Sequence, residues 1–179
     1  MKDVELDQAE TAMMCTIHGV KYPSFTEDTM FGDSGASCHI RNSDEGMYKV
    51  EHIHELIGGI GSDVKATKKG KLRSLIKQAD GTSTVKVLQV KYCARANKNL
   101  FSITQELSKG AKLGSDDSNN ITLDYPDGSK ITFDRRIKTR DGWVGGVDVV
   151  PIIDDVAKLS RDETKAKPVK SSVKEKAIN

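Results

Sequence analysis

The sequence predicts a mainly β protein: a small closed β-barrel with one short late helix. Three features favour this fold: many short stretches of strand-forming residues, turns rich in glycine, and one segment with helical spacing of apolar side chains. The residues from about 26 to 113 have the strongest β character. We therefore divide the chain into a partly flexible N-terminal segment at 1–25, a barrel domain at 26–150 and a charged, disordered tail or linker at 151–179.

The first predicted hairpin turns at Asp80-Gly81, a dipeptide typical of tight connections between antiparallel strands. Residues 72–77 form the strand before this turn, and residues 84–92 form the strand after it. Polar and apolar residues alternate with a period of two in the second strand, so we expect its valines to face one way.

A second hairpin is predicted from residues 121–125 and 130–133, which Pro126-Asp127-Gly128 connects. Residues 142–150 follow as a final strand, which we expect Gly145 and Gly146 to interrupt.

The late helix is predicted within residues 99–107, because Leu100, Ile103 and Leu107 would share one face and Gly110 could stop the helix. A further short helix is expected at 4–14. From residue 158 onward, Lys, Glu, Ser and Ala dominate, and such a composition buries too little apolar surface to offset the entropy of ordering.

The charge distribution argues against a protein built mainly to bind nucleic acid. The formal net charge is only +2, although charged residues make up 30% of the chain. The basic residues gather at 65–77 and 158–176. We interpret the lysines at 65–71 as protecting a strand edge, and the second run as a tail able to make weak nucleic-acid contacts. The chain has no apolar run of the roughly 20 residues that a membrane helix needs, so no membrane partner is expected.

The residues Asp33-Ser34-Gly35-Ala36-Ser37 carry the strongest chemical signal. They place one carboxylate at the start of a tight turn of small residues. Ser34 can donate a hydrogen bond, Gly35 can take an unusual φ, and Ala36 keeps the turn compact. Two carboxylates about 3 Å apart cannot both ionise, so a pair of such turns could supply an acid and a base for peptide hydrolysis. The sequence holds one copy, and the alternative is an ordinary Asx turn.

A second signal lies about 25 residues downstream, in the glycine-rich run Ile57-Gly58-Gly59-Ile60-Gly61. Such a run suits a mobile hairpin tip whose backbone can approach a bound peptide closely and recognise it as an added strand. The alternative is a glycine-rich loop without such a function.

These two stretches and residues 98–102 occur in an order that resembles the retropepsin-like aspartic protease of copia-type retrotransposon polyproteins. The resemblance extends over about residues 28–150 and implies a β-barrel of the retropepsin, or acid protease, type. It implies a homodimer in which Asp33 of each protomer meets at a two-fold axis, one activating water and the other protonating the carbonyl oxygen. No metal or cofactor is required, and residues 99–102 would open the late helix. Gly32 stands where many retropepsins have an apolar residue, so we expect it to weaken the strand.

The resemblance also implies a function: an aspartic endopeptidase that processes extended segments of a Gag-Pol polyprotein. We expect the protein in the cytoplasm or within virus-like particles, which agrees with its three widely spaced cysteines, an odd number typical of reducing compartments.

Three alternatives stay open. The first is an inactive β-barrel module that acts as a structural spacer in a retrotransposon polyprotein, and the second is a nucleic-acid-binding accessory domain. The third, a zinc site at Cys38 and His39 with His52 and His54, is disfavoured because the spacing lacks paired ligands.

Overall fold

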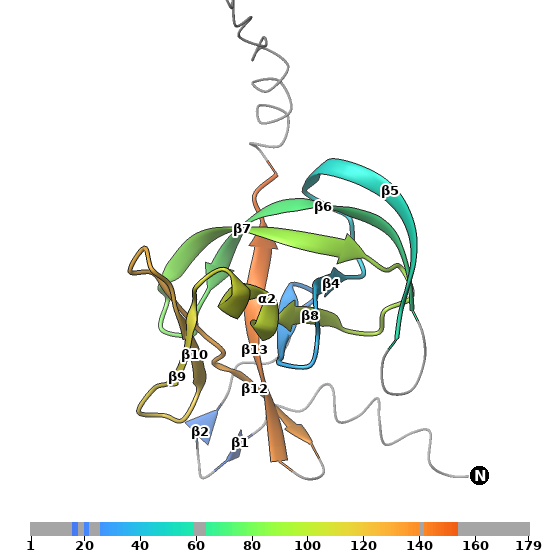
Figure 1. Cartoon of the computed structure of the whole chain (residues 1–179). Coiled ribbons are helices and arrows are strands. Elements are labelled where there is room, and N and C mark those ends of the chain that lie inside the picture. Colours follow the sequence, from blue (N-terminus) through green and yellow to red (C-terminus); the bar gives the residue numbers. More distant parts are fainter. Residues whose placement is uncertain (1–15, 18–19, 22–25, 59–63, 140–141, 154–179) are drawn as a thin grey trace, which may run out of the picture.

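The computed structural model describes residues 16–17, 20–21, 26–58, 64–139 and 142–153 (Figure 1). The chain is mainly β over these residues, as predicted, and α2 (Ile103–Ser108) is the single helix among them. The helix expected at 4–14 and nearly all of the tail from residue 151 onward lie outside the described residues. In the described part of the chain, no helix has the length and apolar character to cross a membrane.

Most strands belong to one strongly curved sheet. The strands in chain order are β1 (Thr16–Ile17), β2 (Val20–Lys21), β3 (Thr29–Asp33), β4 (His39–Arg41), β5 (Met47–Ile57), β6 (Val64–Lys77), β7 (Ser83–Tyr92), β8 (Asn99–Ser102), β9 (Lys112–Ser115), β10 (Ile121–Asp124), β11 (Lys130–Thr132), β12 (Arg135–Thr139) and β13 (Gly142–Pro151). The large sheet has the order β12-β13-β3-β8-β4-β7-β6-β5, and β13 also pairs with β6. The pairing between neighbouring strands therefore runs from β13 through β3, β8, β4, β7 and β6 and back to β13. This closed series of pairings makes the sheet barrel-like.

The hairpin predicted at Asp80-Gly81 is confirmed and joins β6 to β7. Gly81 has a φ of +85°, which glycine adopts without strain, and the Asp80 side chain accepts a hydrogen bond from the Thr82 N–H. The strand before the turn is longer than predicted, because β6 begins at Val64.

The prediction that the valines of β7 share one face is wrong. Val85 and Val87 are 48% and 47% exposed, whereas Leu88 and Val90 are buried. Val85 and Val87 occupy odd positions and Val90 an even one, so the alternation of the strand sends them to opposite faces.

The late helix begins later than predicted. Residues 99–102 form β8, which pairs in parallel with β3 and aligns Asp33 with Ser102. Leu100 therefore lies in a strand, and Leu107 is 36% exposed, so the predicted apolar face of Leu100, Ile103 and Leu107 does not exist. Gly110, predicted as the stop, follows the helix with a φ of +95°.

The second predicted hairpin is confirmed as β10 and β11, which form a separate three-stranded sheet with β9. The prediction that Gly145 and Gly146 interrupt the last strand is wrong, because β13 runs through both residues. Its pairing with β12 at these positions and with β3 at Gly146 holds the strand extended. Strands β9 and β12 were not predicted from the sequence.

The main core lies inside the curved sheet, where α2 also packs (Figure 1). Phe101 and Phe133 meet edge to face with their ring centroids 5.3 Å apart, and both are fully buried. Gly32 belongs to this packing: a Cβ placed there would lie 2.8 Å from the Phe133 ring. The expectation that Gly32 weakens the strand does not fit this geometry, because the missing side chain leaves the room that Phe133 fills.

The lysines at 65–71 do not protect a strand edge. They lie on β6, which has β5 on one side and β7 on the other, so β6 is an interior strand.

Candidate active site at the Asp33 turn

Asp33 ends β3 and starts the predicted turn of small residues. Its Oδ1 accepts hydrogen bonds from the backbone N–H groups of Gly35 (2.7 Å) and Ala36 (3.1 Å). Among the described residues, Oδ2 has no hydrogen-bond partner, and the side chain is half-buried. The turn therefore fixes one carboxylate oxygen and leaves the other available to water or a ligand.

The expected unusual φ of Gly35 is wrong, since this glycine is not among those with positive φ. Space rather than backbone conformation favours glycine here. A Cβ on Gly35 would lie 3.3 Å from Asp33 Oδ1 and would crowd the carboxylate that the turn holds.

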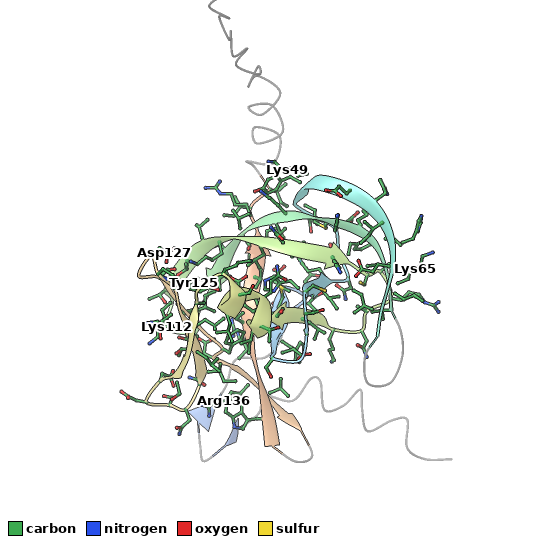
Figure 2. All side chains as sticks on the ribbon, in the orientation of Figure 1. Lys49, Lys65, Lys112, Tyr125, Asp127 and Arg136 are labelled. Atoms are coloured by element: carbon green, nitrogen blue, oxygen red, sulfur yellow. The ribbon has the colours of Figure 1, made fainter. Side chains whose placement is uncertain are left out.

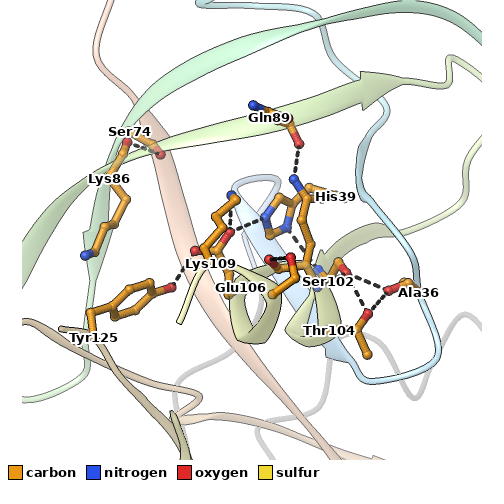
Figure 3. Close-up of polar contacts among 12 residues, drawn as sticks. Ala36, His39, Ser74, Lys86, Gln89, Ser102, Thr104, Glu106, Lys109 and Tyr125 are labelled. Atoms are coloured by element: carbon orange, nitrogen blue, oxygen red, sulfur yellow. Dashed lines mark hydrogen bonds and ion pairs between the residues drawn. The ribbon is translucent and has the colours of Figure 1, made fainter. Parts of the chain in front are cut away.

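The start of α2 anchors the Asp33 turn. The Ala36 carbonyl accepts hydrogen bonds from Ser102 Oγ and Thr104 Oγ1, both at 2.6 Å (Figure 3). Ser102 Oγ also accepts a bond from the Gln105 N–H, so Ser102 caps the helix as well. These contacts were not predicted from the sequence, although the pattern Ser-x-x-Gln at residues 102–105 is a known signal for a helix start.

Behind the turn, His39 and Glu106 form a buried pair (Figure 3). The Ser102 N–H donates to His39 Nδ1 at 2.9 Å, so Nδ1 carries no proton and Nε2 must carry it. Nε2 lies 3.1 Å from Glu106 Oε1 and donates to it. The imidazole thereby connects the helix cap to a carboxylate that is only 3% exposed.

Glu106 gathers two further donors, Lys109 Nζ at 2.5 Å and the Tyr125 hydroxyl at 2.9 Å. Burial by itself would raise the pKa of Glu106, but the hydrogen bonds from His39 and Lys109 outweigh it and lower the pKa to about 2. Burial lowers the pKa of His39, and burial together with the Glu106 charge raises the pKa of Tyr125. The network is thus an ionised carboxylate held by neutral and cationic donors.

A cleft of about 500 Å³ opens at the Asp33 turn. Asp33, Gly35 and Ala36 line one side, and Ile57 and Gly58, at the end of β5, line the same cleft. Its remaining lining residues are Ser37, Cys38, Ile40, Val64, Ala96, Asn97, Lys98 and Leu100. Of the predicted flap residues, the structure thus brings Ile57 and Gly58 to the Asp33 cleft, while Gly59, Ile60 and Gly61 lie outside the described residues.

The cleft is mostly apolar away from the turn. Ile40 and Cys93 form a small buried cluster with Ala66, and Ile57, Val64 and Leu100 pack against it. Asp33 is the one carboxylate that lines the described cleft. Within the described residues, this cleft therefore holds a single carboxylate.

The zinc alternative finds no ligand set in the described residues, where no three His, Cys, Asp or Glu side chains are grouped to hold a metal. Both nitrogens of His39 are engaged by Ser102 and Glu106, whereas His52 and His54 are exposed on β5. Burial raises the pKa of Cys38, and it raises that of Cys93 to about 11, so both stay thiols at neutral pH and are poor nucleophiles.

The fold and the cleft define a barrel-like β domain that presents one carboxylate from a small-residue turn. Residues 30–111 match the model of the family described as "Pol polyprotein, beta-barrel domain". This segment includes the Asp33 turn, the β5–β6 hairpin and α2, and the match indicates a β-barrel domain of a Pol polyprotein. No curated protein and no solved structure matches the chain.

Proposed function

We propose that the protein is a dimeric aspartic endopeptidase, built on a closed barrel of the retropepsin type, that cleaves extended segments of a retrotransposon Gag-Pol polyprotein. One observation carries the proposal. The Asp33 carboxylate is held by two backbone N–H groups and lines a cleft that Ile57 and Gly58, at the end of β5, also line.

The chemistry needs Asp33 from two protomers. When both side chains lie about 3 Å apart, one ionises and the other keeps its proton. The ionised Asp33 takes a proton from water as the water oxygen bonds to the peptide carbonyl carbon, and the protonated Asp33 gives its proton to the carbonyl oxygen. The C–N bond then breaks: the leaving amine takes up the proton that the first Asp33 accepted from water, and the second Asp33 recovers its proton from a hydroxyl on the former carbonyl carbon.

The cleft suits an extended peptide with apolar side chains beside the scissile bond. Ile40, Ile57, Val64 and Leu100 offer apolar surface, and Gly58 lies exposed at the end of β5 without a side chain to cover its backbone. Extended peptides bind such sites as an added strand, with main-chain hydrogen bonds for affinity and pockets for specificity.

The test compares the wild type with Asp33→Asn, which keeps the size of the side chain and removes the ionisable group. Sedimentation velocity should show a dimer for both proteins, and only the wild type should cleave an extended apolar peptide at acidic pH. Asp117→Asn, at an exposed position far along the chain from the turn, serves as the matched control and should leave cleavage unchanged. Equal cleavage by Asp33→Asn, or a wild type that stays monomeric and inactive at high concentration, would refute the proposal.

The inactive spacer is the second candidate, and the single carboxylate in the described cleft favours it when no second protomer binds. It predicts a folded monomer whose unfolding is independent of protein concentration. A dimer would unfold at higher temperature as concentration rises. The proposed weak nucleic-acid contact of the basic tail predicts salt-dependent binding that disappears when residues 158–179 are removed.

A further inference from the structure

A second cavity, of about 510 Å³, adjoins the Asp33 cleft. Ser37, the last residue of the turn, and Cys38, which follows it, line both cavities. A bound peptide that leaves the Asp33 cleft past Ser37 would therefore enter the second cavity. We name this cavity the lysine groove, because Lys49, Lys69, Lys71 and Lys91 line it.

The lysines reach the groove from three neighbouring strands. Lys69 and Lys91 are cross-strand partners on β6 and β7, and Lys71 pairs with Gln89 two residues further along. Lys49 comes from β5, whose arch lies over this part of the sheet (Figure 2). Side chains two residues apart on a strand share a face, so Lys69 and Lys71 present their ammonium groups to the same side.

Carboxylates of the protein neutralise only part of this charge. Glu51 pairs with Lys69 at 2.9 Å, and Glu55 pairs with Lys91 at 2.5 Å. Among the described residues, no carboxylate lies within ion-pair distance of Lys71. The Lys71 ammonium thus offers a positive charge suited to a carboxylate of a ligand, with Gln89, Gln105 and Ser37 as further polar groups in a lining that also includes Glu51.

We propose that the lysine groove binds acidic side chains of the polypeptide substrate, on one side of the apolar segment that occupies the Asp33 cleft. The proposal rests on the proposed protease function and names its substrate class: extended peptides with an apolar centre and a flanking Asp or Glu. A strand advances about 3.3 Å per residue, so the acidic residues follow within a few positions of the centre.

Two features favour a peptide over a nucleic acid. No aromatic side chain lines the groove, so it offers no platform on which bases could stack. Its small net charge suits a few carboxylates better than the continuous charge of a polynucleotide, whose binding relies on many phosphate contacts.

The experiment measures binding to the full-length Asp33→Asn protein, so that no cleavage is needed. The probes are a fluorescent peptide with an apolar centre flanked by glutamates, and the same peptide with glutamines. Fluorescence anisotropy should show that the glutamate peptide binds roughly fivefold more tightly, the effect expected of one partly screened ion pair, with the preference fading at high salt.

Lys71→Glu should abolish or reverse this preference, and it should favour a version of the peptide with lysines in place of the glutamates. Lys77→Glu is the matched control, since Lys77 is exposed on the same strand but does not line the groove. A preference that survives Lys71→Glu would overturn the proposal. Displacement of the glutamate peptide by a single-stranded RNA of uridines would also overturn the proposal, if the RNA acts at a lower concentration than the peptide needs for binding.

The two proposals fail in different ways. If the glutamate peptide binds in the expected manner but the wild type cleaves neither peptide, the protease function fails and the acidic-peptide site stands. If the wild type cleaves both peptides equally and the Asp33→Asn protein binds both equally, the groove proposal fails and the protease function stands.

Discussion

Replacing Glu106 with glutamine should destabilise the protein in a way that depends on pH. Glu106 is 3% exposed and accepts hydrogen bonds from His39, Lys109 and Tyr125. Glutamine keeps the shape of the side chain but removes the charge, and its amide nitrogen cannot accept a hydrogen bond. At least one of the donors around it is then left without an acceptor.

The magnitude follows from the pKa of Glu106, which is lowered from 4.5 to about 2 in the folded protein. At about 1.4 kcal/mol per pKa unit, the folded environment favours the ionised carboxylate by about 3 kcal/mol. A lowered folded pKa means that the unfolded chain binds the proton first as the pH falls. The stabilisation is therefore complete above about pH 4.5 and is lost progressively toward about pH 2.

Urea unfolding followed by tryptophan fluorescence at several pH values checks this prediction. Glu106→Gln should reduce the free energy of unfolding by about 3 kcal/mol at pH 7, and the difference from the wild type should shrink toward zero near pH 2. Glu51→Gln is the control, because it removes an exposed ion pair worth less than about 1 kcal/mol. Equal stability of Glu106→Gln and the wild type at pH 7, or a difference that stays constant with pH, would refute the reasoning.

Three further substitutions test the packing and the turn. Gly32→Ala should lower the free energy of unfolding by about 1–3 kcal/mol, because the new methyl group meets the buried Phe133 ring; an unchanged urea midpoint would contradict this packing. Ser102→Ala removes both the helix cap and a hydrogen bond to the Ala36 carbonyl, and should lower the free energy of unfolding by about 1–2 kcal/mol in the same assay. An unchanged free energy of unfolding would show that other contacts hold the turn. Val87→Thr should stay within about 0.5 kcal/mol of the wild type, since Val87 faces solvent, and a larger loss would place it in a core.

The local turn signals were sufficient to predict both hairpins and the Asp33 turn. Asp80-Gly81 and Pro126-Asp127-Gly128 determine backbone conformation within a few residues, so their effect can be predicted without knowledge of the rest of the chain. The alternation of residues in β7 correctly indicated a strand. It could not say which valines face the core, because that depends on the sheet against which the strand packs.

The start of α2 shows how tertiary pairing overrides helical spacing. Leu100 fits a helix by its spacing from Ile103 and Leu107, yet the parallel pairing of residues 99–102 with β3 holds it in a strand. The hydrogen bonds that stabilise this strand come from β3, about 70 positions earlier in the sequence. A local sequence pattern cannot show a partner at that distance. The strand β12 was missed for a related reason: its pairing with β13 defines it better than its own composition.

The sequence by itself determined the nature of the candidate site: one carboxylate in a turn of small residues, and a glycine-rich run with which it could act. Only the tertiary structure decided what surrounds them. It placed Ile57 and Gly58 at the Asp33 cleft, attached the turn to α2 through Ser102, and moved the lysines of β6 from an expected edge to a groove beside the cleft. The physical reason is that turn chemistry acts between neighbours in sequence, whereas clefts and charge clusters arise from strands that meet only when the sheet curves on itself.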